Sequence, residues 1–277
     1  MSEMTINAPA KLNLSLEIVG KREDGFHELD TLMIPVKGLH DTLTFTVAGK
    51  YALRCDDSKV PTDESNLVTK AVRLFEQETG CEVTHEVLLT KRIPHGAGLG
   101  GGSSDAAKTL EVLNELYGTS LPLVELHDLC SKLGSDVPFF LYNSPCRCKG
   151  RGEEVEVIDR VEPFGVCLLK PDFPVSTPDV YKRWSESKPL KGISYSPQEG
   201  PYGMMVNHLE LPVFEKYLFL AECKRWLLDQ PEVKVAQMSG SGSTMFAILQ
   251  DVTQSEALIL RARNELDPNF FAWSGVV

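Results

Sequence analysis

The stretch Pro94-His-Gly-Ala-Gly-Leu-Gly-Gly-Gly-Ser-Ser-Asp105 places five glycines directly before a pattern that is typical of a helix. Its last three residues, Ser103, Ser104 and Asp105, are of types that cap helix N-termini. Apolar residues then follow at helical spacing: Ala106, Leu110, Leu113 and Tyr117. Backbone N–H groups without side-chain bulk, at the positive end of a helix dipole, form a site for an anion. The stretch therefore predicts a phosphate-binding loop that leads into a helix.

Other phosphate-binding motifs match this stretch less well. A Walker A loop needs Gly-Lys-Ser/Thr, which the chain lacks, and the kinase signatures H-R-D and D-F-G are missing too. Gly96, Gly98 and Gly101 have the spacing of a dinucleotide fingerprint, but a second predicted helix at 123–133 follows and no βαβ unit is completed. A flexible glycine linker is the plain alternative, although linkers rarely end in capping residues and an amphipathic helix.

Two further segments accompany the loop. They are Ala8-Pro-Ala-Lys-Leu-Asn-Leu-Ser-Leu16 near the N-terminus and Met238-Ser-Gly-Ser-Gly-Ser-Thr-Met-Phe246 near the C-terminus. Together with the loop, these segments resemble, in the same order, the three motifs of the GHMP kinase superfamily, which includes galactokinase, homoserine kinase and the mevalonate and phosphomevalonate kinases. The resemblance implies an α+β, two-domain GHMP kinase fold with the active site in the interdomain cleft.

Three shorter segments narrow the resemblance. Pro9-Ala-Lys-Leu-Asn13, Asp24-Gly-Phe-His-Glu-Leu29 and Gly134-Ser-Asp-Val-Pro-Phe-Phe140 are similar to the family of 4-diphosphocytidyl-2-C-methyl-D-erythritol kinases. The resemblance implies ATP-dependent phosphorylation of the 2-hydroxyl, a tertiary alcohol, of a methylerythritol unit in the non-mevalonate isoprenoid precursor pathway. It also implies a small-molecule substrate that carries a cytidine diphosphate group. Mg²⁺ is expected to bridge the ATP phosphates, because the sequence shows no dedicated metal site.

Two charged residues in these segments are the candidate catalytic residues. Asp136 follows Gly134, which is expected to end a helix, and precedes an apolar run, and Gly-Ser-Asp by itself reads as a turn. Lys11 lies at the start of a strand, where a lysine is usually solvated. The resemblance implies that the two meet in the cleft. A carboxylate can accept the proton of the substrate hydroxyl, and a nearby ammonium group favours the ionised form of that carboxylate.

The resemblance also implies the binding residues. Asn66 and Lys91 are expected to contact the nucleotide. The ATP phosphates are expected to bind to the loop residues Pro94, His95, Gly96, Ala97, Gly98, Leu99, Gly100, Gly101, Gly102, Ser103 and Ser104. His95 is expected to shape the loop. Ser103 and Ser104 are expected to contact the phosphates or Mg²⁺; N-capping alone is the alternative, and the two roles are compatible.

For the second substrate, Phe26 and Tyr181 are expected to stack on cytosine and His27 to bond its edge. Most family members have Tyr where this chain has Phe26, so the stacking face is kept and a hydroxyl is lost. The remaining substrate contacts are expected from Asn13, Thr177, Gly240 and Ser241.

Composition limits the other classes of function. The 277 residues carry a net charge of −11, which argues against general binding to nucleic acid or to an anionic membrane. The seven cysteines are scattered without zinc-site spacing, as in a reducing compartment. The opening residues lack the apolar core of a signal peptide, and no apolar run reaches membrane-spanning length, so we expect a cytoplasmic protein, either a monomer or a weak homodimer.

Apolar periodicity predicts strands at 12–18, 43–47, 83–89, 155–158, 165–170 and 246–249. It predicts helices at 66–78, 106–117, 123–133, 214–228 and 255–266, and a long surface connection at 181–202. Strands and helices without regular alternation favour an α+β fold. We place an ATP-binding domain at 1–155 and a substrate-binding domain at 156–277.

Two other functions stay open at this point. A sibling kinase, for homoserine or mevalonate, would share the phosphate loop, but the Phe26-His27 turn and the segment around Asp136 weigh against it. A nucleotide sensor that has lost catalysis would also share the loop. The presence of both Lys11 and Asp136 argues against that loss.

Overall fold

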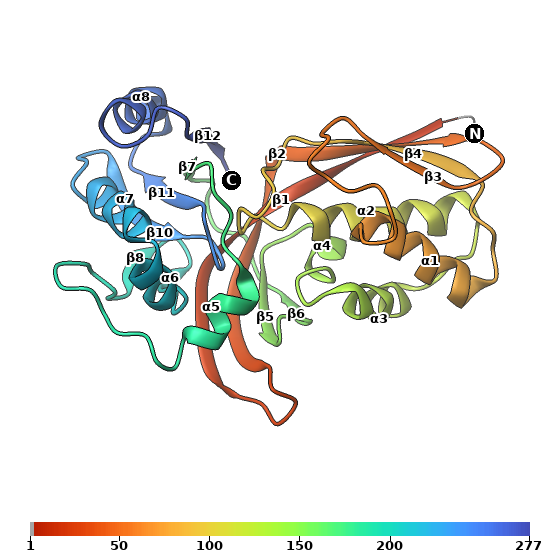
Figure 1. The fold of residues 1–277 in the computed structure, drawn as a ribbon, viewed down its shortest axis with the longest axis horizontal. Helices are drawn as coiled ribbons and strands as arrows, with labels where there is room; N and C mark the ends of the chain where they lie inside the picture. The colour runs from red at the N-terminus through yellow and green to blue at the C-terminus, as the bar shows by residue number, and fades with distance from the viewer. Residues whose placement is uncertain (1–2) are drawn as a thin grey trace.

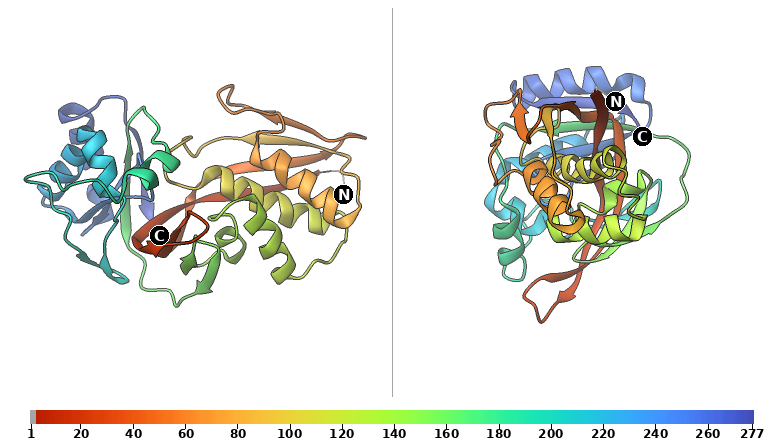
Figure 2. Two further views of the ribbon diagram at one scale, coloured as in Figure 1. Left: turned by 60° about the horizontal axis from the view of Figure 1, so that its bottom comes forward. Right: turned by 90° about the vertical axis from the view of Figure 1, so that its right-hand side faces the viewer.

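Two β-sheets, one in each half of the chain, organise this computed structural model, which describes residues 3–277. The two halves lie side by side, as Figures 1 and 2 show. The N-terminal sheet ends with Val157 and the C-terminal sheet begins with Gly165. The expected α+β fold with two sheet-based parts is confirmed.

The N-terminal half contains a six-stranded sheet in the order β3-β4-β2-β5-β6, with β1 paired to β2. Helices α1 and α2 cover one face of this sheet, and α3 packs against these two helices on their far side (Figure 1). The elements are β1 (Glu3–Lys21), β2 (His27–Val47), β3 (Ala52–Cys55), α1 (Leu67–Thr79), β4 (His85–Thr90), α2 (Gly101–Leu116), α3 (Leu123–Leu133), α4 (Phe139–Tyr142), β5 (Cys146–Gly150) and β6 (Glu154–Val157).

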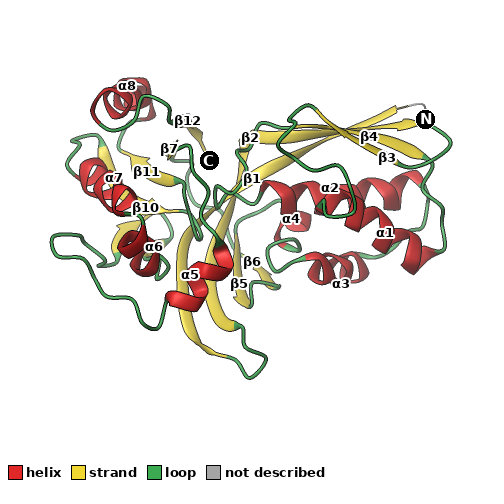
Figure 3. Ribbon diagram, viewed as in Figure 1, coloured by secondary structure: helices red, strands yellow, loops and turns green. Residues whose placement is uncertain are grey.

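The C-terminal half contains a four-stranded antiparallel sheet in the order β10-β11-β7-β12. Helices α6, α7 and α8 lie on its side away from the N-terminal half (Figure 3). The elements are β7 (Gly165–Lys170), α5 (Thr177–Arg183), β8 (Gln198–Gly200), β9 (Gly203–Met205), α6 (Glu210–Lys216), α7 (Leu218–Leu228), β10 (Val233–Met238), β11 (Met245–Leu249), the 3-10 helix η1 (Val252–Gln254), α8 (Ser255–Glu265) and β12 (Phe271–Val276).

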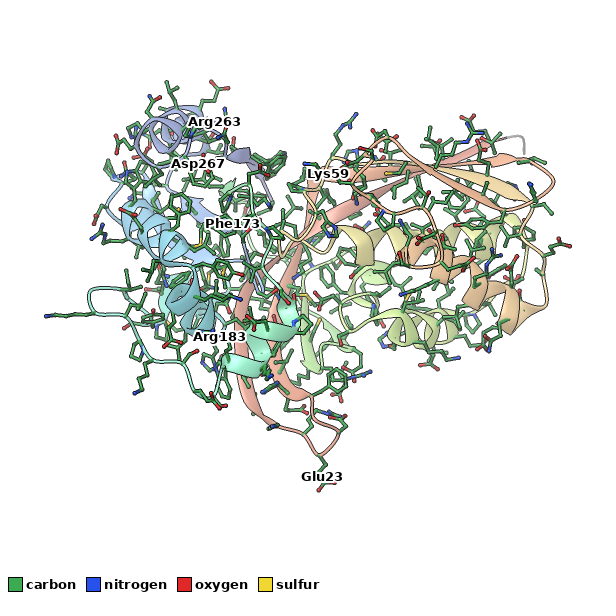
Figure 4. All side chains as sticks on the ribbon, viewed as in Figure 1. Glu23, Lys59, Phe173, Arg183, Arg263 and Asp267 are labelled. Atoms are coloured by element: carbon green, nitrogen blue, oxygen red, sulfur yellow. The ribbon has the colours of Figure 1, made fainter. Side chains whose placement is uncertain are left out.

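The β1–β2 hairpin joins the two halves, and its tip, marked by Glu23, projects away from both (Figure 4). Both strands are much longer than the predicted strands at 12–18 and 43–47. Ala10, Leu12 and Leu14 pack against residues of the C-terminal sheet such as Phe246. Residues 8–14 are therefore buried on both faces, which explains why the alternation of a half-buried strand marked only part of β1.

Several predicted elements are confirmed with small shifts at their ends. Asn66 caps α1 by accepting a hydrogen bond from the Val68 N–H, and Gly80 ends this helix in the left-handed conformation. The helices predicted at 123–133 and 255–266 correspond to α3 and α8. The strands predicted at 83–89, 155–158, 165–170 and 246–249 correspond to β4, β6, β7 and β11.

Three local predictions were wrong in detail. Helix α2 begins at Gly101 with Gly100 as its N-cap, so the supposed capping residues at 103–105 lie inside its first turns. The helix predicted at 214–228 is divided into α6 and α7, because Tyr217 leaves the helical conformation and its ring stacks on Phe173 at 5.5 Å. The predicted connection at 181–202 also contains the end of α5 and the short strand β8.

Within residues 3–277, no helix is both long enough and apolar enough to cross a membrane.

Candidate active site

A cavity of about 940 Å³ lies between the two halves. Segments from both contribute to it, including the glycine loop, the hairpin, α5 and the turn between β10 and β11. All predicted site residues except Ser104 line this cavity: Lys11, Asn13, Phe26, His27, Asn66, Lys91, Pro94, His95, Gly96, Ala97, Gly98, Leu99, Gly100, Gly101, Gly102, Ser103, Asp136, Thr177, Tyr181, Gly240 and Ser241.

Ser104 differs from the prediction. Its side chain is fully buried in the first turns of α2, its Oγ has no hydrogen-bond partner within residues 3–277, and it does not line the cavity. The helix starts earlier than the sequence indicated, which turns this side chain inward. Ser103 lies on the cavity side.

The glycine loop is held tightly by both halves of the protein. The Lys11 N–H donates to Leu99 O at 2.9 Å, and the Thr244 N–H donates to Ala97 O at 3.2 Å. At Gly98, with a φ of +74°, a Cβ atom would lie 2.2 Å from the Ser239 carbonyl oxygen. Only glycine permits this approach, so the turn between β10 and β11 sits directly against the loop.

Lys11 and Asp136 meet in the cavity. The Lys11 Nζ lies 3.3 Å from Asp136 Oδ2, and the side chains are 4% and 38% exposed. The lysine is held inside the protein while the carboxylate reaches the cavity. Asp136 lies in the turn between α3 and α4. Lys11 comes from the part of β1 that is buried on both faces, so this lysine is not solvated as one at a strand start usually is.

Asn13 connects Lys11 to both halves of the site. Its Oδ1 accepts a hydrogen bond from Lys11 Nζ, and its Nδ2 donates to Thr31 Oγ1 at 2.8 Å. The Asn13 N–H donates to Ser239 Oγ at 3.2 Å, and this hydroxyl donates to Gly98 O at 3.1 Å. The buried network fixes the position of the Lys11 ammonium relative to the glycine loop.

Lys91 lies between two buried carboxylates, with hydrogen bonds to Asp41 and, at 2.8 Å, to Asp105 Oδ2. Burial raises the pKa of Asp105 to about 7. The neighbouring Asp41 also raises this pKa, whereas Lys91 lowers it. Burial by itself lowers the pKa of Lys91, but Asp105 and Asp41 outweigh it and raise this pKa. Lys91 therefore ties α2 to β2, in addition to lining the cavity.

Asn66 is likewise engaged in the protein itself. Besides capping α1, its Nδ2 donates to Pro61 O at 2.6 Å. Its side chain is only 9% exposed, at the edge of the cavity that Pro61 also lines.

The hairpin and α5 bring an aromatic cluster to the other end of the cavity. The His27 and Tyr181 rings stack with 5.4 Å between centroids, and Trp184 meets His27 edge-on at 5.9 Å. Phe26 lies apart from this cluster, is 52% exposed, and contacts the Arg151 guanidinium at 5.1 Å from its ring centroid. The cavity thus has aromatic side chains from both halves at this end.

The ionisation of the cluster favours neutral rings. Burial, with the charge of Lys21, lowers the pKa of His27. Burial, with the nearby Asp136 carboxylate, raises the pKa of the Tyr181 hydroxyl. At neutral pH, both side chains therefore offer hydrogen bonds without charge. Next to them, Thr177 Oγ1 and Ser241 Oγ lie 2.7 Å apart and connect α5 to the β10–β11 turn.

The charge of the cavity is opposite to that of the whole chain. Five cationic side chains line it, against the acidic Asp105 and Asp136: Lys11, Lys21, Lys91, Arg151 and Lys182. The chain carries a net charge of −11, so positive potential is concentrated where an anionic ligand would enter. No cluster of three or more potential metal-ligating side chains exists in the described part of the chain.

Sequence reasoning missed several residues of the site. Asp41, Thr31 and Ser239 are buried polar residues that hold the loop, Lys11 and Asn13. Nothing in the local sequence marks Asp41 and Thr31, whereas Ser239 lies within the quoted motif Met238–Phe246. Arg151 and Trp184 line the cavity. One signal was available for Arg151, because it stands between two glycines that adopt positive φ, in a turn of the kind that exposes a side chain.

Comparison with known proteins shows the family of the chain. The model for the N-terminal domain of GHMP kinases matches residues 66–144, and the model for their C-terminal domain matches residues 200–268. The 4-diphosphocytidyl-2-C-methyl-D-erythritol kinase of Methylacidiphilum infernorum is 42% identical over 94% of this chain and 92% of its own length. That of Protochlamydia amoebophila is 41% identical over 90% and 86%. The chain belongs to the 4-diphosphocytidyl-2-C-methyl-D-erythritol kinase family of GHMP kinases.

Solved structures support the same family. A crystal structure of 4-(cytidine 5'-diphospho)-2C-methyl-D-erythritol kinase superposes with a TM-score of 0.78 at 33% identity, covering 99% of this chain and 98% of that one. Homoserine kinase from Cytophaga hutchinsonii has a TM-score of 0.72 at 19% identity, covering 100% and 94%, which shows the shared fold alone. The chain is therefore an enzyme of the small-molecule kinase type.

Proposed function

We propose that this chain transfers the γ-phosphoryl group of ATP to the 2-hydroxyl of 4-diphosphocytidyl-2-C-methyl-D-erythritol, a step of the non-mevalonate isoprenoid precursor pathway. The observation that carries the proposal is the pair of Lys11 and Asp136, with 3.3 Å between Nζ and Oδ2, between a glycine loop and an aromatic cluster in one cavity. The names of the relatives supply the substrate.

In this proposal Asp136 accepts the proton of the attacking hydroxyl. Phosphoryl transfer needs in-line positioning and charge neutralisation more than covalent chemistry by the protein. Lys11 stands beside the carboxylate and offsets the negative charge that develops on the transferred group. Asn13 fixes the lysine in place through its Oδ1. We therefore assign Asp136 as the base and Lys11 as its electrostatic partner.

The N-terminal half, up to about residue 155, binds ATP in this proposal, and the remaining chain supplies most of the substrate side. The loop fits phosphates, because it lines the cavity and leads into the N-terminus of α2, where the first backbone N–H groups of the helix and its dipole favour an anion. Mg²⁺ bound together with ATP would supply charge neutralisation for the transferred group. Ser103, Asn66 and Lys91 are proposed as further nucleotide contacts, and Ser104 acts inside the helix.

The cytidine diphosphate end of the substrate lies at the aromatic cluster in this proposal. Tyr181 and Phe26 offer stacking faces, and the neutral imidazole of His27 offers a hydrogen bond to the cytosine edge. Thr177, Gly240 and Ser241 lie between this end and Lys11, where the diphosphate passes.

The test is ADP release with Mg-ATP in a coupled assay, comparing the cytidyl substrate with homoserine and mevalonate. We expect turnover with the cytidyl substrate only, and its loss in Lys11→Ala. Asp136→Asn should abolish turnover while nucleotide affinity stays close to wild type. Turnover with homoserine or mevalonate would favour a sibling kinase, ATP binding without any turnover would favour a sensor, and an active Asp136→Asn enzyme would contradict the base assignment.

A further inference from the structure

We propose that Arg151 is a positioning residue for cytidine binding, because it holds the exposed Phe26 ring in place as one wall of the cytosine site. The inference rests on the proposed function and adds a residue to which neither the sequence motifs nor that assignment gives a role. It concerns the contact between the β1–β2 hairpin and the turn between β5 and β6.

Phe26 lacks support from its own hairpin. The ring is 52% exposed, at the end of a turn in which the Phe26 N–H donates to Asp24 Oδ1 at 3.0 Å and the Arg22 N–H donates to Phe26 O at 2.9 Å. These bonds fix the backbone of Phe26 and do not hold its ring. A ring that changes rotamer is a poor stacking platform, since its order must be established when the ligand binds.

Arg151 reaches the ring because of strand pairing. Leu29 on β2 is paired with Gly150 on β5 in antiparallel orientation. The residue after Gly150, Arg151, therefore lies near the residues that precede Leu29, which include Phe26. The Arg151 guanidinium carbon lies 5.1 Å from the centroid of the Phe26 ring. This is within the range of a cation–π contact.

The Arg151 side chain is itself fixed. Glu153 accepts hydrogen bonds from the Arg151 N–H at 2.6 Å and from its Nε at 3.2 Å. The same turn passes the proposed base, since a Cβ atom on Gly152 would lie 3.4 Å from Asp136 Oδ1. The turn therefore links the position of the Phe26 ring to that of the catalytic carboxylate.

One face of the ring is covered by the guanidinium, and Phe26 and Arg151 both line the cavity. The other face is available to a planar base. Cytosine bound there completes a stack of guanidinium, phenyl ring and base, opposite the cluster of His27, Tyr181 and Trp184. Besides adding positive charge to the cavity, Arg151 thus contributes to binding indirectly, and this part depends on the presence of the aromatic ring.

A double-mutant cycle on the full chain tests this, with CDP as the probe in isothermal titration calorimetry. The variants are Arg151→Ala, Arg151→Lys, Phe26→Leu and the double variant R151A/F26L. We expect Arg151→Ala to weaken CDP binding about three- to tenfold, as a partly desolvated cation–π contact implies. Arg151→Lys should restore most of it. In the Phe26→Leu background, Arg151→Ala should weaken CDP binding clearly less than it does in the wild type, because only its charge then acts on the ligand.

Arg147 supplies a matched control. It lies on β5, which leads into the turn with Arg151, forms an ion pair with Asp30 and does not line the cavity. Arg147→Ala should bind CDP as wild type does. With the cytidyl substrate, Arg151→Ala should raise KM for that substrate more than it lowers kcat, and leave KM for ATP unchanged.

The outcomes separate the two levels of inference. Equal CDP affinity of wild type and Arg151→Ala, or an equal loss from Arg151→Ala with and without Phe26, would overturn the positioning role alone. A wild-type protein that does not bind CDP would overturn the proposed substrate and this inference with it.

Discussion

Lys224→Met is expected to destabilise the protein in a way that depends on pH. Lys224 and Glu210 form an ion pair at 2.5 Å in which both side chains are only 3% exposed. Glu210 Oε1 also accepts the Met238 N–H at 2.9 Å, just before the turn that contacts the glycine loop. Removal of one partner of such a pair leaves an uncompensated buried charge, at a cost of about 3–5 kcal/mol.

The pH dependence follows from the pKa of Glu210, which burial raises and Lys224 opposes in the wild type. Without the lysine the pKa rises further, so the folded variant holds a proton that the unfolded chain releases. Stability then falls as the pH rises towards the folded pKa, by about 1.4 kcal/mol per unit above the unfolded value. The loss should therefore be larger at pH 8.5 than at pH 5.5.

Urea unfolding followed by circular dichroism at these two pH values measures the effect. The double variant E210Q/K224M is the control, since it removes both charges and keeps an acceptor for the Met238 N–H. It should recover most of the stability at both pH values. A loss below about 1 kcal/mol for Lys224→Met at pH 8.5, or an equal loss at both values, would refute the reasoning.

Three further results are expected. Gly98→Ala should abolish turnover and lower Tm, because the new Cβ would lie 2.2 Å from Ser239 O. The control Gly49→Ala has a similar φ of +77° but nothing within 4 Å of its Cβ, so it should lower the free energy of unfolding by only about 1–2 kcal/mol in thermal melts. A similar loss of stability in both variants would contradict the close approach at Gly98. Asp105→Asn removes a carboxyl group whose pKa is raised to about 7, so in thermal melts its stability relative to wild type should increase from pH 5 to pH 8; a constant difference would show that Asp105 keeps an ordinary pKa. Thr177→Val removes the 2.7 Å contact between the Thr177 and Ser241 hydroxyls. In initial-rate assays it should raise KM for the cytidyl substrate but not KM for ATP. An equal rise of both KM values would contradict the assignment of this contact to the substrate side of the cavity.

Local sequence patterns were sufficient to predict an element where its ends depend only on neighbouring residues. Asn66 and Gly80 delimit α1 because capping and the left-handed stop involve only neighbouring backbone groups. The same logic failed at Ser103 and Ser104, because the packing of Gly100 and Gly101 against Lys11, Phe140 and Ile93 lets the helix begin earlier than its capping residues suggest.

The sequence by itself determined the GHMP kinase family, the α+β class and the candidates Lys11 and Asp136, because these depend on motifs in which residue types and spacing are specific. Only the tertiary structure decided that Lys11 is buried, that Lys91 lies between Asp41 and Asp105, and that Arg151 covers Phe26. Each of these contacts joins residues that are distant along the chain. They arise from strand pairing and from the packing of one half on the other, which leave no periodicity in the local sequence.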